Sequence, residues 1–130
     1  VQMRLLALLL VALLTGCFSF GSGATLFPTI DSPSGAYQAS PEIFNALVRI
    51  NVTNLKSGQD FFFQTRASDY QKWALAWSSK NTLVLYSSDI GTYVYDVKDD
   101  TLVERMPDAD ETETGIKAYQ QKYGRRPNGR

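Results

Sequence analysis

The chain of 130 residues contains no histidine, and Cys17 is its only cysteine. Histidine is the commonest general base in proteins, so its absence excludes catalytic arrangements of the Ser-His-Asp and Cys-His kinds. Zinc sites built from cysteine and histidine are excluded as well. A single cysteine leaves no disulfide within the chain, so the fold must depend on its apolar core. We therefore expect no catalytic residues, no metal site and no enzymatic activity.

Basic and acidic residues balance, with thirteen of each, so the formal net charge is zero. Without an excess of positive charge the chain has no field that attracts nucleic acid, and we expect no such partner. Acidic residues gather at 96–100 and 108–111, and carboxylate oxygens are ligands that calcium prefers. Their spacing does not match an EF-hand loop, so we interpret them as a solvated turn and a helix N-terminus.

The N-terminal region carries the longest apolar run of the sequence. Arg4 precedes ten apolar residues at positions 5–14. As a helix this run would rise about 15 Å, roughly half of the hydrocarbon core of a bilayer. It is therefore too short to span a membrane, and it is typical of the apolar segment of a signal peptide.

Directly behind this run stands the motif Leu14-Thr15-Gly16-Cys17. It resembles the lipobox of bacterial lipoproteins. The resemblance implies cleavage between Gly16 and Cys17, a diacylglycerol group on the Cys17 thiol and an acyl chain, such as palmitate, on its amine. A thiolate is the nucleophile that accepts such a group, and several acyl chains give a stable lipid anchor. Phe18 replaces the aspartate that retains such proteins in the inner membrane, so the resemblance indicates the outer membrane, facing the periplasm.

Composition divides the chain into four parts. Residues 1–16 are the expected signal peptide, and residues 17–27 are the lipidated cysteine with a flexible tether rich in glycine and serine. Residues 28–123 are long enough for one domain. Residues 124–130 are expected to be a mobile basic tail.

Alternation of apolar and polar residues predicts strands over 47–53, 61–65, 82–86, 92–97 and 102–106, with a shorter β-like piece at 36–39. Residues 73–77 place Trp73, Leu75 and Trp77 on one face as a strand, although their propensities also allow a helix over 69–77. We favour the strand, because residues 78–81 then form a hairpin turn.

The C-terminal part changes to a helical pattern. Ile116, Tyr119 and Tyr123 recur at spacings of three and four residues, which predicts an amphipathic helix over 112–123. Asp110 or Thr112 is its expected N-cap, and Gly124 its end. The fold class is therefore α+β, mainly β: an antiparallel meander sheet of five to seven strands with one C-terminal helix.

Three segments resemble pieces of β-propeller blades of the TolB kind: Ser32-Pro33-Ser34-Gly35-Ala36-Tyr37, Ala76-Trp77-Ser78 and Tyr93-Val94-Tyr95-Asp96-Val97. A closed propeller needs about four or more blades of roughly 40 residues, and the chain is too short for it. The pattern from Trp77-Ser78 to the terminal Ala118-Tyr119-x-x-Lys122-Tyr123-Gly124 is similar to small uncharacterised envelope lipoproteins. That resemblance implies a location without an activity.

Two groups of residues are candidates for recognition. Ser88, Asp89, Ile90 and Gly91 form a loop whose apolar residue, Ile90, needs either burial or a partner; the alternative is a simple hairpin turn. The aromatic residues of two predicted strands are candidates for stacking on a sugar, and the alternative is that they fill the core. They are Trp73, Trp77, Tyr93 and Tyr95.

The expected function is that of a membrane-anchored envelope lipoprotein that acts as a non-enzymatic protein-binding or assembly module. Its expected partners are the membrane, through the lipid, and another envelope protein. A module that binds glycan or peptidoglycan is one alternative, and an inhibitor or immunity-type lipoprotein is another.

We predict that Cys17→Ser abolishes incorporation of labelled palmitate and releases the protein from the membrane fraction, because the lipidation chemistry requires a thiol. Ser19→Ala, outside the lipobox, serves as the control and keeps both properties. Labelling of Cys17→Ser at the wild-type level would contradict the prediction.

Overall fold

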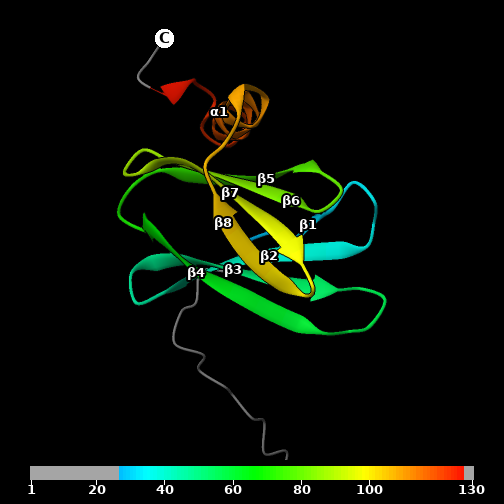
Figure 1. Cartoon of the computed structure of the whole chain (residues 1–130). Helices are drawn as coiled ribbons and strands as arrows, with labels where there is room; N and C mark the ends of the chain where they lie inside the picture. Colours follow the sequence, from blue (N-terminus) through cyan, green and yellow to red (C-terminus); the bar gives the residue numbers. More distant parts are fainter. Residues whose placement is uncertain (1–26, 128–130) are drawn as a thin grey trace, which may run out of the picture.

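The structure is a computed structural model, and it describes residues 27–127. These residues form two four-stranded antiparallel sheets in which every strand pairs with its neighbours in sequence. Sheet A contains β1 (Ile30–Asp31), β2 (Tyr37–Phe44), β3 (Leu47–Asn54) and β4 (Asp60–Ser68). Sheet B contains β5 (Trp73–Ser79), β6 (Thr82–Ser87), β7 (Gly91–Lys98) and β8 (Thr101–Arg105), and α1 (Ala109–Tyr123) follows. The two sheets stack, and α1 lies on the outer side of sheet B (Figure 1).

The predicted fold class, mainly β with an antiparallel meander and one C-terminal helix, is confirmed. The described strands number eight and divide into two sheets, because the chain leaves sheet A after Ser68 and β5 pairs with β6 alone. Each sheet has one apolar face, and stacking buries both faces in one layer. The strand that the sequence missed is β1, which is two residues long.

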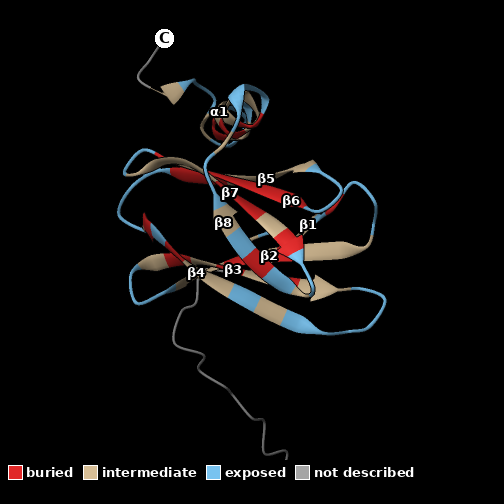
Figure 2. Ribbon diagram, in the orientation of Figure 1, coloured by how far each residue is buried: buried red, intermediate tan, exposed pale blue. Residues whose placement is uncertain are grey.

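The core lies between the sheets. In β3 the alternate residues Val48, Ile50 and Val52 are buried, and Arg49 points the other way. β6 and β7 meet them from sheet B, and the buried residues gather where the sheets face each other (Figure 2). The buried members of this layer are Ala39, Val48, Ile50, Val52, Ala67, Trp73, Leu83, Leu85, Tyr95, Val97 and Leu102.

The strand interpretation of residues 73–77 is confirmed by β5. Trp73, Leu75 and Trp77 pack into the layer between the sheets. The two alanines that alternate with them lie on the face of sheet B that α1 covers, and Ala74 is buried there. A small side chain at these positions lets the helix approach closely.

Sheet B is therefore buried on both faces, and α1 packs closely on it at Gly115. A β-carbon at this glycine would lie 3.1 Å from Cγ1 of Val84 and 3.3 Å from Cβ of Tyr86. One turn later, the rings of Tyr119 and Tyr86 pack edge to face with centroids 5.1 Å apart. Burial on both faces explains why β6 is a continuous apolar run.

The N-cap of α1 is Asp108, so the prediction of Asp110 or Thr112 is wrong. The Asp108 carboxylate accepts the Glu111 backbone N–H at 2.8 Å, and the Glu111 carboxylate accepts the Asp108 N–H at 3.0 Å. This reciprocal pair is a capping box, and it starts the helix directly after Pro107. At the other end Gly124 adopts the left-handed conformation with φ 74°, as predicted for the residue that ends the helix.

We predict that Asp108→Ala lowers the free energy of unfolding by about 1 kcal/mol, because the Glu111 N–H loses its acceptor. Asp110→Ala is the matched control: it removes the same charge from the same helix turn without removing a cap. Urea unfolding followed by tryptophan fluorescence measures both variants. Equal losses would show that helix charge, and not the cap, sets the stability of this end.

Candidate functional site

The four aromatic residues considered for sugar stacking do not form an exposed face. Trp73 is 4% exposed and Tyr95 is 0% exposed. Trp77 and Tyr93 are half-buried and pack against the same core. All four lie on the inner faces of β5 and β7, because odd-numbered residues of both strands point toward sheet A. The alternative assignment, to the core, is the one that the structure shows.

The Ser88–Gly91 loop is a hairpin turn between β6 and β7. The Asp89 N–H donates to Oγ of Ser87 at 3.1 Å, and the Ser88 N–H donates to the Lys72 carbonyl at 2.9 Å. The Ile90 side chain packs against the core, so burial accounts for the apolar residue at this turn. Ser88 and Asp89 are the exposed part of the loop.

Other predicted features lie at the ends of the chain. Cys17, the cleavage site at Gly16 and most of the tether lie outside the described residues. In the predicted basic tail, Arg126 pairs with Glu113 of α1 at 3.2 Å. Within residues 27–127, no helix has both the length and the apolar character needed to cross a membrane.

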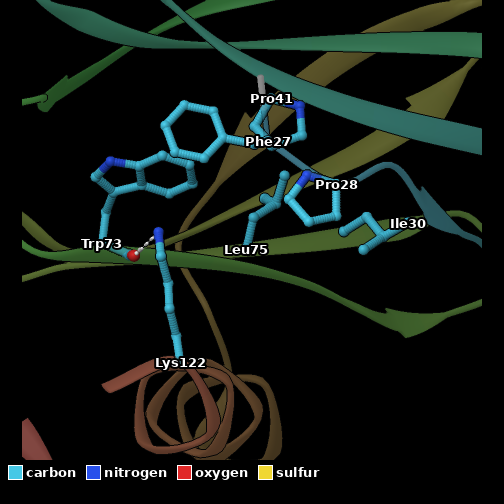
Figure 3. A pocket seen from close by; sticks show the side chains of 7 residues that line it. All are labelled: Phe27, Pro28, Ile30, Pro41, Trp73, Leu75 and Lys122. Carbon is cyan, nitrogen blue, oxygen red and sulfur yellow. Dashed lines mark hydrogen bonds between the residues drawn. The ribbon is translucent and has the colours of Figure 1, made fainter. Parts of the chain in front are cut away.

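The structure adds a cavity that the sequence did not reveal. It has a volume of about 200 Å³ and lies where β1 and β5, the edge strands of the two sheets, meet the last turn of α1 (Figure 3). Its lining is apolar apart from one ammonium group. The residues are Phe27, Pro28, Ile30, Pro41, Trp73, Leu75 and Lys122.

A wider and shallower hollow of about 540 Å³ shares Ile30, Leu75 and Lys122 with this cavity. It continues along β5 between β1 and α1, and it adds Asp31, Trp77 and Gln121 to the lining. A hydrogen bond links β5 to β1 beside the hollow: Nε1 of Trp77 donates to the Ile30 carbonyl at 3.0 Å. We call the cavity and the hollow together the edge groove.

Lys122 is the charged group of the cavity. Its Nζ donates to the Trp73 carbonyl at 2.8 Å and lies 3.5 Å from the centroid of the Trp73 ring, a cation–π contact. Burial of the ammonium lowers the pKa of Lys122, and the negative charge of Asp69 opposes that shift. Among the described residues, no carboxylate forms an ion pair with Lys122.

The neighbouring Tyr123 caps the free edge of β5. Its hydroxyl accepts the Trp73 N–H at 3.2 Å and donates to the Trp73 carbonyl at 3.0 Å. Backbone groups of an antiparallel strand alternate between its two sides, so those of Leu75 and Trp77 also point away from β6. They therefore point from the strand edge toward the groove.

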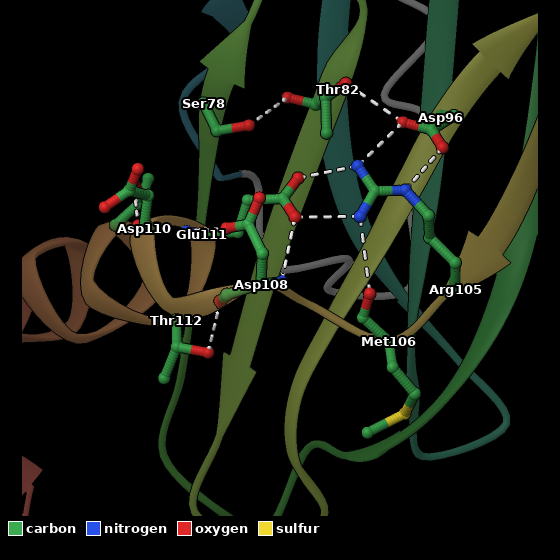
Figure 4. A network of polar contacts seen from close by, with 10 residues as sticks. Ser78, Thr82, Asp96, Arg105, Met106, Asp108, Asp110, Glu111 and Thr112 are labelled. Carbon is green, nitrogen blue, oxygen red and sulfur yellow. Dashed lines mark hydrogen bonds and ion pairs between the residues drawn. The ribbon is translucent and has the colours of Figure 1, made fainter.

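A second polar cluster surrounds Arg105, at the opposite end of α1 (Figure 4). The guanidinium donates to both carboxylate oxygens of Glu111 at 2.7 Å and to Oδ2 of Asp96 at 2.6 Å. These hydrogen bonds lower the pKa of both carboxyl groups against the opposing effect of burial. Two of the acidic residues considered for calcium are thus engaged by an arginine that joins sheet B to α1.

The outer face of sheet A carries a group of exposed apolar and charged side chains. Phe62 is 62% exposed and Phe44 is 46% exposed. The Arg49 guanidinium lies between them, 4.4 Å from the Phe44 centroid and 5.0 Å from the Phe62 centroid, and it pairs with Glu42. We call these four residues the aromatic–arginine patch.

A signal for this patch is present in the sequence. Phe61, Phe62 and Phe63 are consecutive in a predicted strand, and alternation must place one or two of them on the outer face. The structure turns Phe61 and Phe63 inward and Phe62 outward. Which face is the outer one depends on how the two sheets stack, and local sequence does not contain that information.

Comparison with protein-family models, with curated proteins and with solved structures finds no match to this chain. The candidate sites are therefore the two surfaces described above, the edge groove and the aromatic–arginine patch.

We predict that Tyr123→Phe lowers the free energy of unfolding by about 1 kcal/mol, because the buried Trp73 N–H and C=O lose a shared partner. Hydrogen exchange at the Trp73 amide should accelerate in the same variant. Tyr70→Phe is the control, since the Tyr70 side chain is 86% exposed. Unchanged exchange at Trp73 would show that the tyrosine hydroxyl does not protect the strand edge.

Proposed function

We propose that the protein is a membrane-anchored envelope lipoprotein whose domain binds another envelope protein through the outer face of sheet A, without catalysing a reaction. The observation that carries this proposal is the aromatic–arginine patch. α1 covers the outer face of sheet B, and within residues 27–127 no helix or strand covers the outer face of sheet A (Figure 1).

The composition of the patch favours a protein partner. Aromatic residues and arginine are enriched at the energetically dominant positions of protein interfaces. Removing one exposed phenylalanine side chain from water is worth about 1.5–3 kcal/mol, and Phe62 has most of its surface available. The expected partner is a protein surface with an apolar pocket that accepts the Phe62 ring.

Arg49 supports the proposal through preorganisation. The guanidinium is held between two rings and by Glu42, so its side chain has little rotamer freedom left to lose when a partner binds. Immobilising a flexible side chain at an interface costs about 0.5–1.5 kcal/mol, and a held arginine avoids much of that cost. The partner then meets a surface that already has its bound shape.

The lipid anchor is part of the same proposal, and it rests on the Leu14-Thr15-Gly16-Cys17 motif. An anchor on the outer membrane would confine the domain to the periplasmic surface, where it meets other membrane-bound proteins at high local concentration. The aromatic residues that motivated the glycan-binding alternative lie in or against the core.

We predict that a photo-crosslinking amino acid at position 62 of the lipidated chain captures one discrete envelope protein, whereas the same probe at Gln120, on the exposed side of α1, does not. The captured protein is then identified by mass spectrometry, purified and titrated. Phe62→Ser should weaken its binding at least tenfold, which corresponds to about 1.4 kcal/mol.

Met106→Ser is the matched control, because it removes a 68% exposed apolar side chain directly after β8 of sheet B, and its affinity should stay at the wild-type value. Equal capture at positions 62 and 120, or unchanged affinity of Phe62→Ser, would count against the outer face of sheet A as the binding surface.

A further inference from the structure

We propose that the edge groove binds the free carboxyl terminus of an extended polypeptide: the terminal carboxylate pairs with Lys122, the last side chain fills the apolar cavity, and the preceding backbone adds to the edge of β5. This is a different surface from the outer face of sheet A, so the inference stands independently of the proposed function. Within residues 27–127 three observations carry it: a cation that forms no ion pair, a cavity sized for one side chain and a strand edge with which no described strand pairs.

Lys122 is the charged residue of the cavity lining, and it forms no ion pair within residues 27–127. All ion pairs among the described residues use arginine: Arg49 with Glu42, Arg66 with Glu104, Arg105 with Asp96 and Glu111, and Arg126 with Glu113. The other described lysines also form no ion pair, but they do not line the cavity. Lys122 instead lies over the Trp73 ring and donates one hydrogen bond, to the Trp73 carbonyl. An ammonium has three N–H donors, so two remain for a ligand. The ligand group complementary in charge to Lys122 is an anion, and a carboxylate is the common one in proteins.

The cavity beside Lys122 sets the size of what accompanies the anion. Its volume is about 200 Å³, and Phe27, Pro28, Ile30 and Leu75 make it apolar (Figure 3). A dry apolar cavity of about 150 Å³ holds a benzene molecule, so this one accepts one leucine- or phenylalanine-sized side chain. A carboxylate within a few ångströms of one such side chain is what the last residue of a polypeptide presents.

The hollow that extends from the cavity suits a peptide backbone better than a hydrocarbon chain. Asp31 and Gln121 line it together with apolar residues. Its floor is the outer edge of β5, where the backbone groups of Leu75 and Trp77 point away from β6. An added strand pairs with such groups, and side-chain pockets then select its sequence.

The direction of the peptide follows from where Lys122 lies. The ammonium is at the Trp73 end of β5, and the strand runs from Trp73 to Ser79. A peptide whose carboxyl terminus is at Trp73 therefore runs antiparallel to β5, the orientation used by every other strand pair in the described domain. Tyr123 occupies the backbone groups of Trp73, so added pairing begins at Leu75.

The test uses the full chain in detergent micelles and two synthetic peptide libraries, randomised at their last four residues. One library ends in a free carboxylate and the other in a carboxamide. We expect the free-acid library alone to yield binders, with leucine, isoleucine, valine or phenylalanine at the last position. Amidation of a selected peptide should weaken its binding at least tenfold in wild-type protein, a comparison that needs no variant.

Variants then assign the contacts. Lys122→Met should weaken the binding of the selected acid peptide at least tenfold. It should also remove the difference in affinity between the acid and the amide forms of that peptide. Lys117 is an exposed lysine on the same helix, and Lys117→Met should leave the affinity for the acid peptide and the acid–amide difference unchanged. Binding should also slow hydrogen exchange at the Leu75 and Trp77 amides. Phe62→Ser should bind the peptide normally, so a failure at the groove and a failure at the aromatic–arginine patch are told apart.

Several results would overturn the inference. One is equal selection from both libraries, and another is an acid preference that survives in Lys122→Met with wild-type stability in urea. A third is binding of dodecanoate with the same dependence on Lys122 but without any selected peptide, which would assign the groove to a free amphipathic carboxylate. A fourth is selection of no peptide and no binding of dodecanoate, which would leave the groove without a carboxylate ligand.

Discussion

The contact between Gly115 of α1 and Val84 of β6 fixes how closely the helix lies against sheet B, and much of the structure depends on it. A β-carbon at position 115 would lie 3.1 Å from Cγ1 of Val84, so a larger residue there would require Val84 or the helix to shift by a few tenths of an ångström. With one cysteine, the chain has no disulfide of its own to hold α1 in place. The same contact, about two helical turns before the C-terminus of α1, sets Lys122 and Tyr123 against Trp73 and so creates one wall of the edge groove.

The surfaces of the domain differ in how many of their polar and apolar groups already have partners within the domain. The Arg105 cluster joins the helix to sheet B, and each of its three charged groups has a hydrogen-bond partner within the cluster. The edge of β5 is closed at Trp73 by two helix side chains, which is one way in which proteins protect a strand edge from unwanted pairing. Beyond Trp73 that protection stops, and the groove begins. The outer face of sheet A is the other surface that remains open, and its exposed phenylalanines are held in place by Arg49.

Local pattern in the sequence predicted most of the strands and the end of the helix. Alternation located β3, β6 and β7, and it correctly placed Trp73, Leu75 and Trp77 on one face of a strand over residues 73–77. It failed at the N-cap, where Asp108 and Asp110 are chemically equivalent and only the reciprocal bond with Glu111 separates them. The edge groove was beyond prediction, because Phe27, Trp73 and Lys122 are far apart in sequence and meet through tertiary packing. The roles of the aromatic residues also required the stacking of the sheets, which alone decides whether Trp73 or Phe62 is exposed.

The position of α1 at the end of the described chain has a consequence for folding. Every strand pairs with a neighbour in sequence, so both sheets can form early from local contacts. The helix then returns to β5 across 50 residues of sequence, between Trp73 and Tyr123. Until it docks, the outer apolar face of sheet B is exposed to solvent. The groove is thus completed last. A ligand bound in the groove would stabilise the docked helix by mass action. Binding at the groove would therefore favour the fully folded domain over the form with the helix undocked.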